Sequence, residues 1–153
     1  MESGIPYANG LIKNRYIGRT FIQSSQPQRE RAVRLKLNAI RAVIEGKRVV
    51  IVDDSIVRGT TLGRLVSILR EAGASEVHLR ISSPPFLYPC YFGTDIPERD
   101  VLLLNQLTIP QIVEKFHLTS LKFMDIGDLG TITKGIHCGT CDACFTGNYA
   151  LPV

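Results

Sequence analysis

The sequence predicts an α/β fold with a parallel sheet at its centre. A β-branched run at residues 48–52 is too short for a helix and reads as a buried strand, and residues 76–81 form the next strand. Between these runs, apolar residues at helical spacing predict a helix over residues 62–72, which Gly73 ends. A strand, a loop, a helix and a second strand in this order form a βαβ unit, so the two strands should run parallel.

The chain before this unit carries weaker signals. Residues 1–27 mix short apolar pieces with Gly, Pro and Ser, so we expect mostly loop, with a possible short strand at residues 7–12. Residues 28–45 place apolar side chains at largely helical spacing among Arg and Lys, which predicts a helix. Gly46 would end that helix.

After residue 83 the sequence pattern becomes less regular. Prolines make the stretch up to Gly93 irregular; a helix at residues 109–116, a short strand at 121–124 and a turn or short helix at 127–133 follow. The last residues are rich in Cys, Gly and Thr and have little periodicity, so something other than a core must order them. We therefore divide the chain into residues 1–134 and a Cys-rich tail of residues 135–153.

Composition and charge indicate an ordinary globular chain. It has 153 residues, 44% of them hydrophobic, and a net charge of +4, which suffices for one modest domain. No apolar run approaches the roughly 18 residues of a membrane span, and no secretory signal is present, so we expect a cytoplasmic protein without a membrane partner. Basic residues concentrate between Lys13 and Arg48. They suit an anionic ligand, but no aromatic-rich strand or finger motif supports nucleic acid.

The most informative segment is VVIVDDSIVRGTT, residues 49–61. A strand brings the chain to a sheet edge, where open α/β folds bind ligands. Two carboxylates follow, which could bind ribose hydroxyls and hold Mg²⁺, and the next residues open a helix whose amides and hydroxyls suit a phosphate. A generic strand that ends in acids explains only the first half of this segment. We expect a sugar phosphate to contact Asp53, Asp54, Ser55, Arg58, Gly59, Thr60 and Thr61.

Within this segment, VDDSIVRGTT resembles the phosphoribosyl-pyrophosphate motif of type I phosphoribosyltransferases, and specifically of the amidophosphoribosyltransferases that begin purine synthesis. Three further segments resemble that family in the same order: GLIKNRYIGRTFI at residues 10–22, its flexible loop, SPPFLYPCYFGTD at 83–95 and CDACFTGNY at 141–149. The resemblance implies a type I phosphoribosyltransferase-like parallel sheet flanked by helices, truncated at its N-terminus.

The resemblance also implies an activity. Ammonia from glutamine would attack the anomeric carbon of phosphoribosyl pyrophosphate and form 5-phosphoribosylamine, the first step of de novo purine (IMP) synthesis. A mobile loop with Lys13, Arg15 and Arg19 would close on the leaving pyrophosphate and exclude water. Without the resemblance, such residues more often form a solvated surface. Feedback by purine nucleotides and a homo-oligomer are further implications.

The sequence departs from the family in two places. No cysteine precedes Cys90, so the N-terminal nucleophile of a glutaminase is absent, and the pyrophosphate-binding loop should lie before residue 1. We therefore expect this fragment alone to be inactive. Two alternatives stay open: a non-catalytic phosphoribosyl-pyrophosphate-binding module, and a nucleobase phosphoribosyltransferase, which would have no reason for the cysteine tail. A zinc-dependent nucleic-acid module is the last alternative.

Cysteine spacing indicates a metal site. Cys138, Cys141 and Cys144 lie within seven residues, which favours metal over disulfides in a chain without a secretory signal. Spacing alone does not choose between structural zinc and an iron–sulfur cluster. The resemblance implies a 4Fe–4S cluster held by Cys90, Cys141 and Cys144, with a structural role. It places the fourth ligand upstream of this chain, and Cys138 is a possible substitute.

Overall fold

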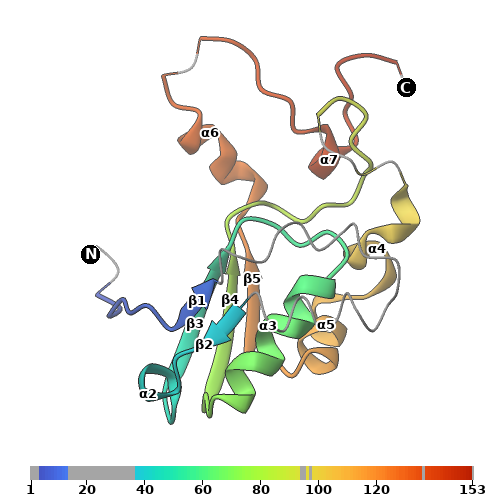
Figure 1. Ribbon diagram of the computed structural model, residues 1–153. Helices are drawn as coiled ribbons and strands as arrows, with labels where there is room; N and C mark the ends of the chain where they lie inside the picture. The colour runs from blue at the N-terminus through green and yellow to red at the C-terminus, as the bar shows by residue number, and fades with distance from the viewer. Residues whose placement is uncertain (1–3, 14–36, 94–95, 97, 136, 153) are drawn as a thin grey trace.

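The computed structural model describes residues 4–13, 37–93, 96, 98–135 and 137–152. Its centre is a three-stranded parallel sheet in the order β3-β4-β5 (Figure 1). The strands are β3 (Arg48–Asp53), β4 (Glu76–Ile81) and β5 (Ser120–Phe123). The predicted α/β class with a parallel sheet is confirmed, and β4 has the predicted bounds.

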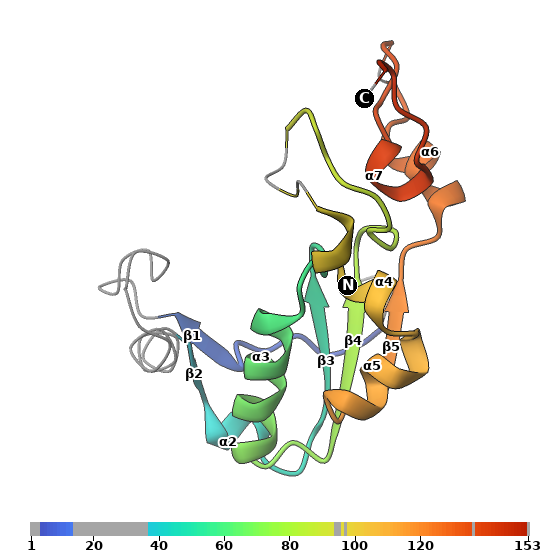
Figure 2. The same ribbon diagram turned by 90° about the vertical axis from the view of Figure 1, so that its right-hand side faces the viewer.

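Two helices cover one face of this sheet. They are α3 (Thr60–Glu71) and α5 (Ile109–Lys115), and Figure 2 shows both on the same side of the strands. Every second residue of β4 points toward them and is buried, because side chains alternate along a strand. Each fully buried Val, Leu or Ile side chain stabilises the fold by about 1.5–3 kcal/mol. Both helices match the predicted ones apart from one or two terminal residues.

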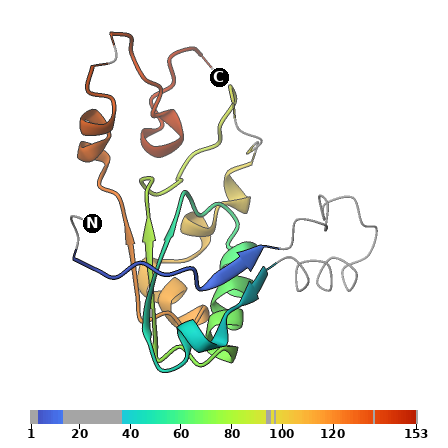
Figure 3. The same ribbon diagram turned by 60° about the vertical axis from the view of Figure 1, so that its left-hand side comes forward.

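The opposite face of the sheet, which we call the open face, carries no helix in the described part of the chain and is crossed there by the extended segment of residues 4–10 (Figure 3). Val50 and Val52 of β3 are 40% and 71% exposed there. The prediction of a strand is confirmed, but the prediction that this strand is buried is wrong for the open face. The apolar run alone predicted burial on both faces, whereas the helices cover only one of them.

Polar side chains on the open face join β4 to β5. Arg80 Nη1 donates to Ser120 Oγ at 3.0 Å, and His78 Nδ1 lies 2.8 Å from the same oxygen. The other ring nitrogen of His78, Nε2, lies 2.8 Å from Glu76 Oε2. These four side chains thus form one continuous chain of hydrogen bonds across the two strands.

A second, two-stranded sheet precedes the parallel one. It pairs β1 (Leu11–Lys13) with β2 (Leu37–Ala39) in antiparallel fashion, and the short helix α2 (Arg41–Ile44) follows. The helix predicted at residues 28–45 is therefore wrong at residues 37–39, and residues 28–36 lie outside the described part. Leu11 and Ala39 pack against the core. Strand pairing with this burial outweighs the helical preference of the local sequence.

The remaining elements lie beyond the carboxyl ends of the parallel strands (Figures 1 and 3). They are η2 (Arg99–Val101), α4 (Leu103–Gln106), η3 (Ile126–Asp128), α6 (Leu129–Ile132) and α7 (Ala143–Thr146). The predicted turn or short helix at residues 127–133 corresponds to η3 and α6. Sequence periodicity missed η2, α4 and α7, since each is about one turn long. In the described segments, no helix is long and apolar enough to cross a membrane.

Candidate functional site

The loop of residues 53–61 begins at the carboxyl end of β3 with two carboxylates. Asp53 Oδ1 accepts a hydrogen bond from the Asp54 amide at 3.0 Å, and the Ser55 hydroxyl donates to Asp54 Oδ1 at 3.0 Å. From the end of β4, the Ser82 amide and hydroxyl both donate to the Asp53 carbonyl oxygen, at 3.0 and 3.2 Å. These bonds fix the acidic residues at the sheet edge and leave Asp54 exposed to solvent.

The same loop ends at the N-terminus of α3. Thr60 and Thr61 begin the helix and are exposed, no side chain caps it, and no acidic residue lies in its first turn. The first amides of a helix have no partner within the helix and carry a partial positive charge. The end of the loop therefore offers hydrogen-bond donors to an anion, a few residues from the two carboxylates.

Contacts with α4 and the core set the shape of this loop. Ile56 is 4% exposed and anchors the loop in the core. The Val57 carbonyl accepts a hydrogen bond from the Leu103 amide at 2.8 Å. Gly59 has a φ of 75°, and a Cβ atom there would lie 2.8 Å from Leu103 Cδ2. A glycine is thus required both by the backbone and by the neighbouring side chain.

The structure places the predicted site residues in two groups. The seven residues predicted to contact a sugar phosphate all lie in the 53–61 loop. Of the three predicted basic residues, Lys13 lies in β1, exposed to solvent, and Arg15 and Arg19 lie outside the described residues. Ser82 and Leu103 were not predicted, because they reach the loop from distant parts of the sequence and belong to no local motif.

Two surface hollows lie away from this loop. One, of about 590 Å³, is lined by residues of α5 and β5. The other, of about 340 Å³, lies between α3 and α5. Neither hollow includes a residue of the 53–61 loop. The functional groups of the loop, rather than a deep cavity, therefore define the candidate site.

The C-terminal tail packs on the segment of residues 86–91. The Cys144 carbonyl accepts hydrogen bonds from the Leu87 and Tyr88 amides, both at 3.1 Å. Phe145 meets Phe86 edge to face, with ring centroids 4.9 Å apart. Tyr149 adds a hydrogen bond from its hydroxyl to the Pro89 carbonyl at 2.8 Å and a ring contact with Tyr91. Hydrogen bonds and aromatic contacts thus hold the tail against this segment.

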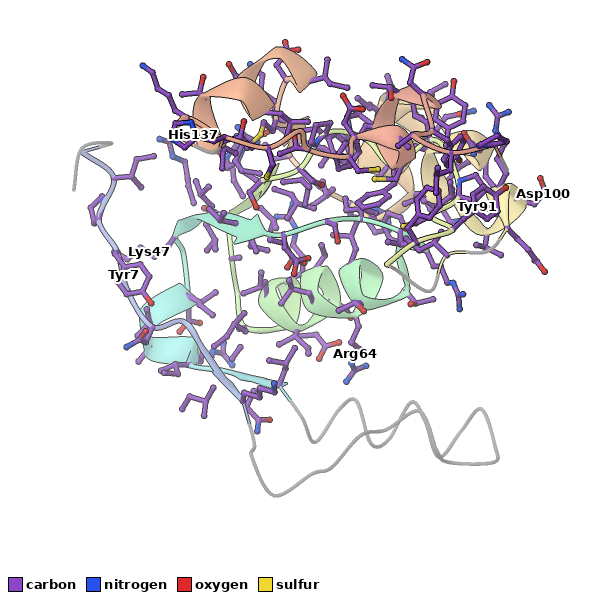
Figure 4. The ribbon with its side chains drawn as sticks, turned by 90° about the horizontal axis from the view of Figure 1, so that it is seen from above. Tyr7, Lys47, Arg64, Tyr91, Asp100 and His137 are labelled. Atoms are coloured by element: carbon purple, nitrogen blue, oxygen red, sulfur yellow. The ribbon has the colours of Figure 1, made fainter. Side chains whose placement is uncertain are left out.

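Three thiols share this neighbourhood. Burial raises the pKa of the Cys144 thiol above its ordinary value, and the adjacent Cys90 and Cys141 groups raise it further. Across the described residues, however, no three His, Cys, Asp or Glu side chains converge closely enough to hold a metal ion. Cys138 is exposed, and His137 lies on the opposite side of the molecule from Tyr91 (Figure 4). The thiols are therefore neighbours without forming a closed ligand set.

Similarity to known proteins covers nearly the whole chain. It is 53% identical to the amidophosphoribosyltransferase of Bacillus subtilis (strain 168) over 154 residues, which is 96% of this chain and 32% of that relative. It is 51% identical to the amidophosphoribosyltransferase of Synechocystis sp. over 151 residues, 99% of this chain and 30% of the relative. The chain thus spans about a third of the length of the curated relatives that it matches.

Solved structures agree with these relatives. The glutamine phosphoribosylpyrophosphate (PRPP) amidotransferase from B. subtilis complexed with ADP and GMP matches with a TM-score of 0.79 and 52% identity, over 97% of this chain and 33% of that one. A structure described as the allosteric regulatory enzyme of purine biosynthesis matches with a TM-score of 0.81 and 51% identity, over 96% of this chain and 32% of that one.

A family model describes the shared domain. The model for the phosphoribosyl transferase domain matches residues 1–82, more than half of the chain, and includes the whole 53–61 loop. The predicted resemblance to amidophosphoribosyltransferases is confirmed by the relatives and by the solved structures. This chain belongs to the phosphoribosyl transferase domain family, and its similarity to amidophosphoribosyltransferases extends over nearly all of its residues.

Proposed function

We propose that this chain is part of an amidophosphoribosyltransferase, which makes 5-phosphoribosylamine from phosphoribosyl pyrophosphate and glutamine at the start of de novo purine synthesis. The observation that carries the proposal is the 53–61 loop, where two fixed carboxylates at a sheet edge are followed directly by an uncapped helix N-terminus. A sugar phosphate needs both kinds of group at this spacing. The description of the B. subtilis structure as a glutamine phosphoribosylpyrophosphate amidotransferase supports the same two substrates.

The loop would bind the two ends of the sugar differently. Asp53 and Asp54 would accept hydrogen bonds from the ribose hydroxyls, while the amides and hydroxyls at Thr60 and Thr61 would bind the 5-phosphate. Ser55, Arg58 and Gly59 would complete the cradle. Mg²⁺ would neutralise charge on the pyrophosphate, and the donor set suits it, because Mg²⁺ is usually held by one or two carboxylates together with substrate phosphates.

The reaction would be a displacement at the anomeric carbon. The nitrogen of ammonia forms a bond to that carbon, the bond to the pyrophosphate oxygen breaks, and pyrophosphate leaves with the electron pair. Lys13, Arg15 and Arg19 would neutralise the leaving group and exclude water as their loop closes. The protein contributes mainly by positioning and by electrostatic stabilisation. A glutaminase domain outside this chain would supply the ammonia.

Regulation and assembly extend the proposal. The B. subtilis relative was solved with ADP and GMP bound, which supports purine nucleotides as feedback inhibitors of the protein that contains this chain. The proposed protein acts as a homo-oligomer in the cytoplasm.

The cysteine tail would hold a 4Fe–4S cluster through Cys90, Cys141 and Cys144. Thiolates are the ligands that such clusters require, and contacts with residues 86–91 already bring these three into one neighbourhood. The sulfur atoms would have to move closer together, and the fourth ligand would be Cys138 or a residue outside this chain. The cluster would tie the tail of residues 135–153 to residues 1–134. Zinc is the alternative metal.

A binding measurement tests the substrate assignment. In the native protein, we expect the double substitution Asp53→Asn and Asp54→Asn to weaken binding of Mg²⁺-phosphoribosyl pyrophosphate at least about a hundredfold in calorimetry, because charged hydrogen bonds to the ribose are lost. Glu114→Gln, which removes an exposed carboxylate on α5, is the control and should leave the affinity unchanged. Equal affinities in the double variant and the wild type would refute the assignment.

Metal analysis tests the cluster separately. Anaerobically purified native protein should contain iron and inorganic sulfide in about equal amounts and absorb visible light, as iron–sulfur proteins do. Zinc in their place would remove the iron–sulfur proposal and leave the sugar-phosphate site standing.

A further inference from the structure

Two described stretches, residues 87–93 and 98–106, together touch both candidate sites. At one end, the Leu87 amide donates a hydrogen bond to the Cys144 carbonyl in the tail. At the other end, the Leu103 amide donates to the Val57 carbonyl in the 53–61 loop, and the Leu103 side chain lies against Gly59. The two sites are far apart in the sequence, yet each is bonded to one of these two stretches, which together we call the bracket.

Asn105 holds the bracket together. Its side-chain Nδ2 donates to the Leu87 carbonyl at 3.0 Å and to the Arg99 carbonyl at 3.1 Å, so both hydrogens of the amide group are used. Leu87 is thus fixed on both sides, through its amide by the tail and through its carbonyl by Asn105. Asn105 also lies two residues from Leu103 within α4, and its own amide bonds to the Leu102 carbonyl at 3.1 Å.

We propose that Asn105 is a positioning residue that couples the cysteine tail to the 53–61 loop. The inference rests on the proposed function for the identity of the two ligands, and on the contacts above for the coupling itself. If the tail loosens, the Leu87 amide loses its hydrogen bond to the tail. Leu87 can then move, and the Asn105 side chain, which donates to the Leu87 carbonyl, moves with it. Because α4 is a single turn, a shift at Asn105 also moves Leu103, and with it the Val57 carbonyl and the contact at Gly59.

The coupling has a functional consequence in both directions. A metal cluster that fastens the tail would also hold the 53–61 loop in the shape that binds phosphate. Phosphoribosyl pyrophosphate, by ordering the loop, would in turn hold the tail in place, since coupling between two binding sites is reciprocal. The cysteine site would therefore influence substrate affinity without contacting the substrate.

The substitution Asn105→Asp tests this role, because it keeps the size of the side chain and removes both donated hydrogens. We expect the amides of Leu87, Tyr88 and Leu103 in the native protein to exchange hydrogen roughly tenfold faster, equivalent to about 1.4 kcal/mol. The Kd for Mg²⁺-phosphoribosyl pyrophosphate should rise several-fold. Asn9→Asp is the matched control, since it adds the same charge at an exposed position and can still accept the hydrogen bond from Tyr7.

The exchange rates decide the outcome without any ligand. Faster exchange at Leu87 and Tyr88 with an unchanged rate at Leu103 would show that the two sites are independent and would overturn the proposal. If Asn105→Asp fails to fold, the wild-type protein gives a second test: Mg²⁺-phosphoribosyl pyrophosphate should slow exchange at Leu87 and Tyr88, and unchanged rates there despite binding would overturn it. A wild-type protein that binds no phosphoribosyl pyrophosphate would refute the proposed function instead, while the Asn105→Asp exchange rates would still test the coupling.

Discussion

Replacing Gly59 with alanine tests whether the contact with α4 sets the shape of the 53–61 loop. Gly59 has a φ of 75°, in the left-handed region, and Leu103 Cδ2 would lie 2.8 Å from an added Cβ atom. Real Cβ atoms do not approach other heavy atoms so closely, so either the loop or α4 must move. The substitution therefore combines a backbone cost with a packing cost, and a second glycine allows the two to be separated.

The magnitudes follow from these two terms. A residue other than glycine in the left-handed region costs about 1–2 kcal/mol. Inserting a methyl group into a packed contact costs about 1–3 kcal/mol more. Gly46 has a φ of 69°, but a Cβ atom added there would meet no described atom within 4 Å, so Gly46→Ala carries the backbone cost alone. We expect Gly59→Ala to reduce the free energy of unfolding by about 2–5 kcal/mol and Gly46→Ala by about 1–2 kcal/mol.

Urea unfolding of the native protein, followed by circular dichroism, measures both variants under one condition. A lower midpoint with an unchanged slope would report a true loss of stability. Gly59→Ala should also weaken binding of phosphoribosyl pyrophosphate, while Gly46→Ala should not. Equal losses of stability in the two variants would refute the reasoning, because the contact with Leu103 would then contribute nothing.

Two further predictions concern how α3 and the tail are held. Arg70 donates hydrogen bonds to the Ser75 and His117 carbonyls, both at 2.9 Å, whereas the buried Arg64 Nε has no partner among the described residues. Arg70→Met should therefore reduce the free energy of unfolding by about 2–3 kcal/mol, and Arg64→Met should change it by less than about 0.5 kcal/mol; similar losses in urea would contradict this. Phe145→Ala removes the ring contact with Phe86 and should destabilise tail docking by about 1–2 kcal/mol. Limited proteolysis should then cleave the tail faster, and an unchanged cleavage rate would show that the contact is dispensable.

The βαβ unit was predictable because its signals are local. In β3, α3 and β4, the apolar period, the flanking glycines and the β-branched residues all favour the same structure, so the elements fall close to their predicted bounds. The helix predicted for residues 37–39 was wrong for the opposite reason. Their strand exists because they pair with residues 11–13, and no feature of the local sequence reports a partner so far away.

The residues of the candidate site were likewise predictable where they are contiguous in the sequence and unpredictable where the fold brings them together. The 53–61 loop is contiguous in the sequence, so its residues could be identified together. The neighbourhood of Cys90 and Cys144 could be expected only from the family resemblance, since spacing suggests Cys138 equally well. Asn105 carried no signal at all, because a short polar residue near the end of a one-turn helix is typical of the surface. Its carbonyl partners are Leu87, 18 residues away, and Arg99 in η2, and no local motif reports either contact.

The polar chain on the open face of the sheet has a direction. Arg80 has only donors, so Ser120 Oγ accepts from it, and a Glu76 carboxylate can only accept. In the tautomer of His78 that carries its hydrogen on Nε2, the ring donates to Glu76 and its Nδ1 accepts the hydrogen of the Ser120 hydroxyl. Sliding β5 by one residue would put Leu121 opposite His78 and turn Ser120 toward the helices, which interrupts this sequence of donors and acceptors. The polar side chains of β4 and β5 on this face therefore select the same strand alignment as the buried leucines on the other face, and mispairing of β5 is disfavoured twice.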